Sequence, residues 1–121
     1  MLSALSFVVV AEPSLECSID LGSQIEIADC VAEVEATVDK TTELALGFAM
    51  NATIEMDEII GREVAAAALV QGRSAWFGYR DAHCEHVGWT FRGDSGTDIA
   101  IHSCRVELGR ARVTELMNYA Q

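Results

Sequence analysis

Proline is almost missing from this chain, which has one such residue, Pro13, in 121 positions. Because proline interrupts helices and lacks a backbone donor, its scarcity permits long uninterrupted helices. Alternation of β-branched and polar residues is not sustained over the length of a strand either, which argues against a sheet. The sequence therefore predicts an all-α fold.

Familiar catalytic motifs are also missing. The sequence has no Gly-x-Ser-x-Gly elbow, no His-Glu-x-x-His pair and no glycine-rich phosphate loop. Asp81, the three histidines and the hydroxyl of Ser74 could do acid–base work, but no motif positions them together. We therefore predict that the protein is not an enzyme and that it uses no cofactor.

The sequence also lacks closely spaced cysteines. The four cysteines are Cys17, Cys30, Cys84 and Cys104, and no Cys-x-x-Cys occurs among them. This spacing favours neither a zinc site nor a thiol redox pair. In a small chain that is exported, four cysteines are instead typical of two disulfides. Three pairings are possible, and we expect the sequential one, because it closes two short loops.

The histidines suggest one alternative, a metal site. His83 and His86 are three residues apart on a predicted helix, with Glu85 between them and His102 on the next helix. Against this, the pair lies near a helix end, where solvated histidines are common, and the cysteines are expected to be oxidised. No metal is therefore predicted. The Arg-Gly-Asp tripeptide that begins at Arg92 is interpreted as a turn.

The first 11 residues form an apolar run without the basic residues that usually begin a signal peptide. Val9 and Ala11 nevertheless have the small-residue spacing of a cleavage site. The run is shorter than the about 20 apolar residues that span a bilayer. We expect residues 1–11 to be a signal peptide and residues 12–121 to be one domain, periplasmic or secreted, with no membrane anchor.

Negative charge is concentrated in the first half of the chain. Residues 1–61 contain twelve acids and one base, Lys40, whereas residues 62–121 contain seven acids and seven arginines. The net charge of −11 attracts basic partners and repels nucleic acid and anionic membranes. An acidic surface also keeps an exported protein soluble, so both interpretations stay open.

Three helices are predicted from the spacing of apolar residues. The first is capped by Ser23 or Asp20, with Glu26 reaching back to the cap, and a turn follows between residues 51 and 61. Its predicted buried stripe consists of Ile27, Val31, Val34, Val38, Thr41, Ala45 and Phe48. The second helix runs from about residue 62 to 91. The third, capped by Ser95 or Thr97, ends near residue 119 and forms an antiparallel hairpin with the second.

A disulfide across that hairpin would set the register of its two helices. If Cys84 bonds to Cys104, moving back along one helix means moving forward along the other, so Trp76 should lie near Arg112. An arginine over the Trp76 ring would contribute roughly 0.5–2 kcal/mol. Asp81 is the expected carboxylate for a half-buried arginine. The stretch from residue 71 to 84, "QGRSAWFGYRDAHC", is thus interpreted as a packing seam.

These residues resemble the signature of the LprI-type lysozyme inhibitor domain of exported bacterial proteins. The matching positions are Gln71, Trp76, Tyr79, Arg80, Asp81, Cys84, Gly93, Ser95, Cys104, Arg112 and Leu116. Cys17 and Cys30 resemble the earlier cysteine pair of that family, so the resemblance covers about residues 17–119. Asp94 departs from the pattern, because the loop usually has a second glycine there. Gly109 departs too, standing where a threonine often precedes the arginine.

The resemblance implies a small, exported, disulfide-bonded helical domain, three helices stapled by two disulfides, and lysozyme inhibition in part of the family. An acidic inhibitor suits c-type lysozymes, which are strongly basic. The expected partner is therefore a c-type lysozyme or another basic protein; the alternative is a periplasmic interaction module with a different partner. Residues expected to form the seam are Gln71, Trp76, Tyr79, Arg80, Asp81, Arg112 and Leu116. Candidate partner contacts are Glu33, Glu35, Asp39, Glu43, Arg92, Asp94 and Ser95.

Overall fold

The computed structural model describes residues 12–19 and 22–121, which form four helices and no strand. They are α1 (Pro13–Ser18), α2 (Gln24–Ile60), α3 (Ala65–Trp89) and α4 (Ser95–Tyr119). The all-α prediction is confirmed, and the three predicted helices correspond to α2, α3 and α4. The expected signal peptide, residues 1–11, lies outside the described residues, and so does Asp20. Within the described part, no helix is both long and apolar enough to cross a membrane.

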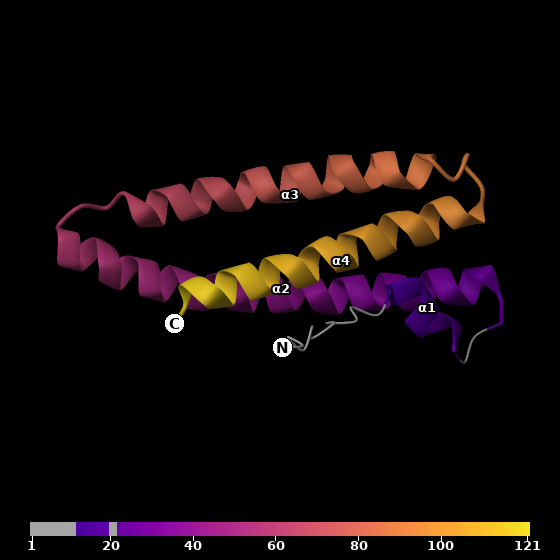
Figure 1. Cartoon of the computed structure of the whole chain (residues 1–121), viewed down its shortest axis with the longest axis horizontal. Helices are drawn as coiled ribbons and strands as arrows, with labels where there is room; N and C mark the ends of the chain where they lie inside the picture. Colours follow the sequence, from indigo (N-terminus) through magenta and orange to yellow (C-terminus); the bar gives the residue numbers. More distant parts are fainter. Residues whose placement is uncertain (1–11, 20–21) are drawn as a thin grey trace, which may run out of the picture.

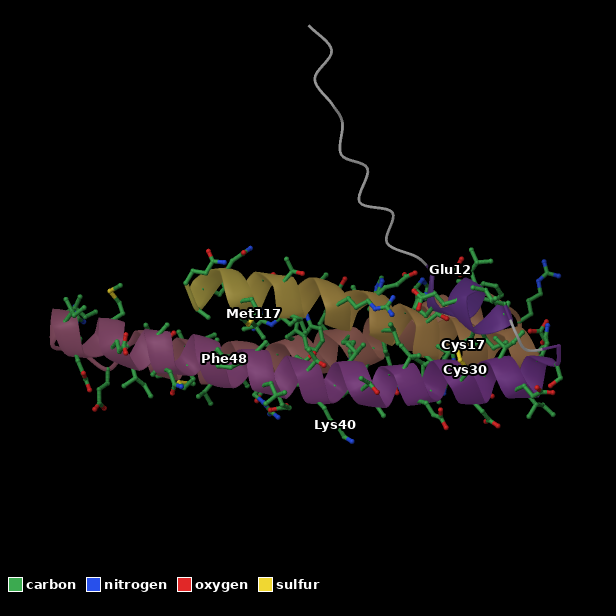
Figure 2. The ribbon with its side chains drawn as sticks, turned by 90° about the horizontal axis from the view of Figure 1, so that it is seen from below. Glu12, Cys17, Cys30, Lys40, Phe48 and Met117 are labelled. Carbon is green, nitrogen blue, oxygen red and sulfur yellow. A yellow bond between two sulfur atoms is a disulfide. The ribbon has the colours of Figure 1, made fainter. Side chains whose placement is uncertain are left out.

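The prediction of three helices missed α1, which has only six residues. Pro13 occupies its first turn, where the missing N–H has no helical acceptor in any case. A helix this short shows no apolar periodicity, so the sequence pattern could not reveal it. The disulfide between Cys17 and Cys30 fastens α1 to α2, with Cα atoms 5.9 Å apart (Figure 2).

Helix α2 begins after one of the two predicted caps and ends within the predicted turn interval. The Ser23 hydroxyl accepts the backbone N–H of Glu26 at 3.1 Å and donates to the Glu26 carboxylate at 3.0 Å, which confirms the predicted cap. The helix ends at Ile60, and the next residue, Gly61, has a φ of 72° that suits glycine. The turn therefore lies at the last position of the predicted interval.

Part of the predicted stripe on α2 was wrong. Thr41 and Phe48 are exposed, and the neighbouring Thr42 and Ala49 are buried instead. Periodicity leaves two adjacent positions on the border of a stripe, and the contact with α4 decides between them. Thr42 and Ala49 are small enough for close packing, and the Thr42 hydroxyl is satisfied by donating to the Val38 carbonyl at 2.8 Å.

Figure 1 shows α2, α3 and α4 running lengthwise beside one another, with α3 antiparallel to both α2 and α4. The core has two parts. One contains Cys17, Val31, Val38 and Val106; the other contains Ala45, Ala49 and Leu116. Close approach of α4 to α2 depends on Gly109, because a Cβ at this position would collide with the Val38 side chain.

The second disulfide joins α3 to α4. Cys84 and Cys104 are bonded with Cα atoms 5.4 Å apart, and the Cys84 side chain is completely buried. Both disulfides therefore have the expected sequential pairing, and α3 and α4 form the expected antiparallel hairpin. Close to this bond, Gly88 leaves space for Ile101 of α4, which a Cβ would fill.

Candidate functional site

Arg80 lies at the centre of the seam and connects two helices. Its side chain is 9% exposed and forms an ion pair with Asp39 of α2, in which Nη1 and Oδ1 are 2.7 Å apart. A second ion pair joins it to Asp81 of its own helix at 2.8 Å. The guanidinium also lies over the rings of Trp76, at 5.6 Å, and Phe77, at 4.9 Å. One buried cation thus has two carboxylates and two aromatic faces.

Asp81 extends this cluster to α4. Its Oδ1 lies 3.6 Å from Nε of Arg105, so the same carboxylate contacts an arginine on each helix of the hairpin. Arg105 in turn contacts Glu35 of α2 at 3.5 Å, and Glu35 also lies 3.4 Å from Nδ1 of His102. Charged side chains therefore link α2, α3 and α4 near the Cys84–Cys104 bond.

The remaining seam residues divide into an inner and an outer set. Arg112 lies over the Trp76 ring at 6.0 Å, and Leu116 is 1% exposed. Gln71 and Tyr79, in contrast, are exposed, and Tyr79 stacks on His83 with ring centroids 5.3 Å apart. The structure thus brings Trp76 and Arg112 together, whereas Gln71 and Tyr79 do not join the packing between the helices.

Three of the four acids predicted as partner contacts on α2 form ion pairs inside the molecule. Glu35 contacts Arg105, Asp39 contacts Arg80, and Glu43 contacts Arg73. Glu33 is exposed and has no ion pair among the described residues. The arginines of the second half of the sequence were the available signal for these pairs, but matching each acid to a base requires the helix register.

The residue that caps α4 differs from the two predicted ones. Asp94 caps the helix by accepting the Gly96 N–H at 2.8 Å, so the prediction of Ser95 or Thr97 was wrong. The Thr97 hydroxyl instead accepts the Gly93 N–H at 3.0 Å. The reason is the backbone conformation: an N-cap residue is not helical, and Asp94 is extended, whereas residue 95 is already helical. Arg92 and Asp94, two predicted partner contacts, are exposed on this loop.

The histidines do not come together with other ligands. Among the residues that the structure describes, no three His, Cys, Asp or Glu side chains are close enough to share a metal ion. His83 stacks on Tyr79, and His102 lies beside Glu35. The geometry of the seam is therefore that of a helix-to-helix joint built from charge and aromatic contacts.

Comparison with known proteins identifies the family of this chain. Residues 16–116 match the family described as "Lysozyme inhibitor LprI". The uncharacterized protein R02472 of Rhizobium meliloti (strain 1021) is 35% identical over 99 residues, which cover 78% of this chain and 71% of that protein. No solved structure matches the chain. The family match spans both disulfides and the whole seam, and the chain belongs to the LprI family.

Proposed function

We propose that this protein is an exported inhibitor that binds a basic c-type lysozyme and blocks its activity. The observation that carries the proposal is the match to the lysozyme inhibitor family over residues 16–116. The net charge of −11 supports it, because an acidic protein associates faster with a basic enzyme. Inhibition by binding needs a stable surface and no catalytic group.

The fold supplies such a stable surface. Two disulfides fasten α1 to α2 and α3 to α4, and the ion pairs of Arg80 and Arg105 connect α3 and α4 to α2. A binding surface that is already ordered loses little conformational entropy when the partner binds, which favours affinity. The disulfides also suit the oxidising environment of an exported protein.

The predicted contact residues on α2 differ in how readily they could bind a partner. Glu33 is exposed and is the simplest candidate among them. Glu35, Asp39 and Glu43 would each have to exchange an internal arginine for one from the lysozyme. In the loop before α4, Arg92 and Asp94 are exposed and stay in the proposed contact set together with Ser95.

A lysis assay tests the proposal. Purified, oxidised protein without residues 1–11 is added to a c-type lysozyme and bacterial cell walls at low and at physiological salt, beside an unrelated protein of equal negative charge. We expect lysis to stop near an equimolar ratio at both salt concentrations, and only with this protein. Undiminished lysis, or loss at low salt with both proteins, would reject inhibition and leave an interaction module with another partner.

A further inference from the structure

The end of α2 and the start of α3 project beyond the end of α4. The last buried residue of α4, Leu116, packs against Ala45 and Ala49 of α2. Helix α2 continues to Ile60, which places its end about 16 Å beyond Ala49 at 1.5 Å per residue. Figure 1 shows only α2 and α3 at this end. We call residues 54–64, which lead from α2 into α3, the hairpin tip. It belongs to the hairpin of α2 and α3, not to the disulfide-bonded hairpin of α3 and α4.

The hairpin tip exposes five large apolar side chains within eleven residues. Its large apolar residues, with their exposed fractions, are Ile54 (44%), Met56 (53%), Ile59 (79%), Ile60 (50%) and Val64 (49%). No apolar residue of the tip is buried, because α4 ends before it could cover them. Clustered apolar side chains on a soluble domain are typical of a surface that contacts another molecule.

The turn that carries these side chains is held firmly. Asp57 is 5% exposed, and its two carboxylate oxygens accept the backbone N–H groups of Ala65 at 3.0 Å and Ala66 at 2.9 Å. The same residue's carbonyl accepts the Arg62 N–H at 3.1 Å. Asp57 therefore caps α3 from the end of α2, so the tip is ordered before any partner binds.

The tip also carries negative charge that the rest of the molecule does not neutralise. Glu55, Glu58 and Glu63 are exposed and have no ion pair among the described residues, and Arg62 is the single base of the segment. The middle of α2 is different, because Glu35, Asp39 and Glu43 are paired with arginines there. Unpaired negative charge thus lies beside exposed apolar surface at this end.

We propose that the hairpin tip makes the main contact with the basic partner, ahead of the α2 acids and of the loop before α4. Ile59 is the apolar anchor, and Glu55, Glu58 and Glu63 attract the partner's lysines and arginines. This inference rests on the proposed function, which supplies the basic partner. A hollow beside the turn is lined by Ile54 and by three charged side chains that are exposed, Glu58, Arg62 and Glu63. Because the two glutamates outnumber the arginine, the hollow suits the aliphatic stem and charged end of a basic side chain.

Charge selects this occupant over two others. A second copy of the chain would bring the same three glutamates against the tip, and the repulsion would oppose association. An anionic membrane surface would be repelled in the same way. A basic protein surface is the occupant for which both the apolar contact and the charge are favourable.

A pair of matched variants tests the apolar anchor. Ile59 is 79% exposed and Ile25, near the other end of α2, is 75% exposed. The affinity of the oxidised protein for a c-type lysozyme is measured by calorimetry at physiological salt. We expect Ile59→Ser to raise Kd at least about tenfold, as for a buried interface anchor, and Ile25→Ser to leave it within about twofold. Equal Kd values for the wild type and both variants would overturn the inference.

A second pair tests the charge. Glu58→Lys at the tip and Glu33→Lys on the middle of α2 make the same change in net charge. We expect Glu58→Lys to weaken binding more and to reduce its salt dependence more. The reverse order would place the contact on the middle of α2 and overturn the inference. Circular dichroism checks that every variant keeps the wild-type helix content.

The outcomes separate the two proposals. If the wild type binds and inhibits lysozyme but the tip variants are unchanged, only the hairpin tip is rejected and the proposed function stands. If the wild type does not bind, both proposals fail. Sedimentation of the wild type without lysozyme completes the test, since a dimer that Ile59→Ser disrupts would assign the tip to a second copy instead.

Discussion

Arg80 of α3 and Asp39 of α2, which are 41 residues apart in the sequence, form an ion pair at 2.7 Å. The arginine side chain is 9% exposed, whereas the aspartate is 40% exposed. The arginine has lost most of its water, so it depends on its carboxylates and on the aromatic rings beneath it. This pair is the main charged link between α2 and α3.

Replacing Arg80 by methionine should therefore destabilise the fold. The change keeps the apolar stem but removes both ion pairs, and because the carboxylates left behind are half exposed, we expect a loss of about 1–3 kcal/mol. Arg73→Met is the control, since the Arg73–Glu43 pair is exposed on both sides and should contribute less than about 1 kcal/mol. Urea unfolding measures both; equal losses would contradict the central role of Arg80.

The two disulfides should contribute unequally, although their loops are similar. The bonded cysteines are 13 and 20 residues apart, and chain entropy alone assigns each bond about 3 kcal/mol. We expect the short α1 to detach while α2, α3 and α4 stay packed. The Cys17→Ser, Cys30→Ser protein should therefore lose protection of the α1 amides in hydrogen exchange, and its Tm should fall by the smaller amount of the two double variants. The Cys84→Ser, Cys104→Ser protein should show the larger drop. The opposite order would mean that α1 is part of the cooperative core.

Two glycines in helices should respond oppositely to alanine. Gly78 has open space where a Cβ would lie, so Gly78→Ala should stabilise the protein by about 0.5–1 kcal/mol through helix propensity. Gly109→Ala should destabilise it by about 1–3 kcal/mol, because the new methyl collides with Val38, a stiff β-branched side chain. Thermal unfolding of both variants measures the difference. A stable Gly109→Ala protein would show that α4 can move away from α2 at little cost.

One carboxyl should make stability depend on pH. Desolvation raises the pKa of Glu107 above its ordinary value, the Glu12 carboxylate raises it further, and Arg110 lowers it in part. The charged form is thus disfavoured in the folded state. This group has no effect on stability below its ordinary pKa of 4.5, and its destabilising effect is complete once the pH is above the raised pKa. Glu107→Gln should therefore raise Tm slightly at pH 7, and the gain should vanish near pH 4. A gain that persists at pH 4 would have another cause.

Local patterns in the sequence predicted much of the fold. The cap at Ser23 or Asp20, the turn between residues 51 and 61 and the hairpin of α3 and α4 each depend on residues close together in the chain. The structure has the cap at Ser23, the turn at Gly61 and the hairpin. The approach of Trp76 to Arg112 followed from the hairpin register once the cysteine pairing was assumed. Contacts within the disulfide-bonded hairpin of α3 and α4 are thus accessible to sequence reasoning.

Contacts between α2 and the later helices were not accessible in the same way, because no disulfide joins α2 to α3 or α4 and sets their register. Asp39 and Arg80 pair only because α2 and α3 have a particular axial offset, which no local pattern encodes. The same lack of register led to the choice of Phe48 over Ala49 as a buried position. The exposed end at Ile59 also required the structure, because it results from α4 being shorter than α2.

The pairing of consecutive cysteines has a consequence for how the oxidised chain is made. A chain that leaves a membrane channel with its amino terminus first presents Cys17 and Cys30 before either later cysteine. Cys84 then meets Cys104 when the first two thiols are already joined. An oxidase that couples thiols in order of appearance would therefore produce the native pairing directly, without a step of disulfide rearrangement.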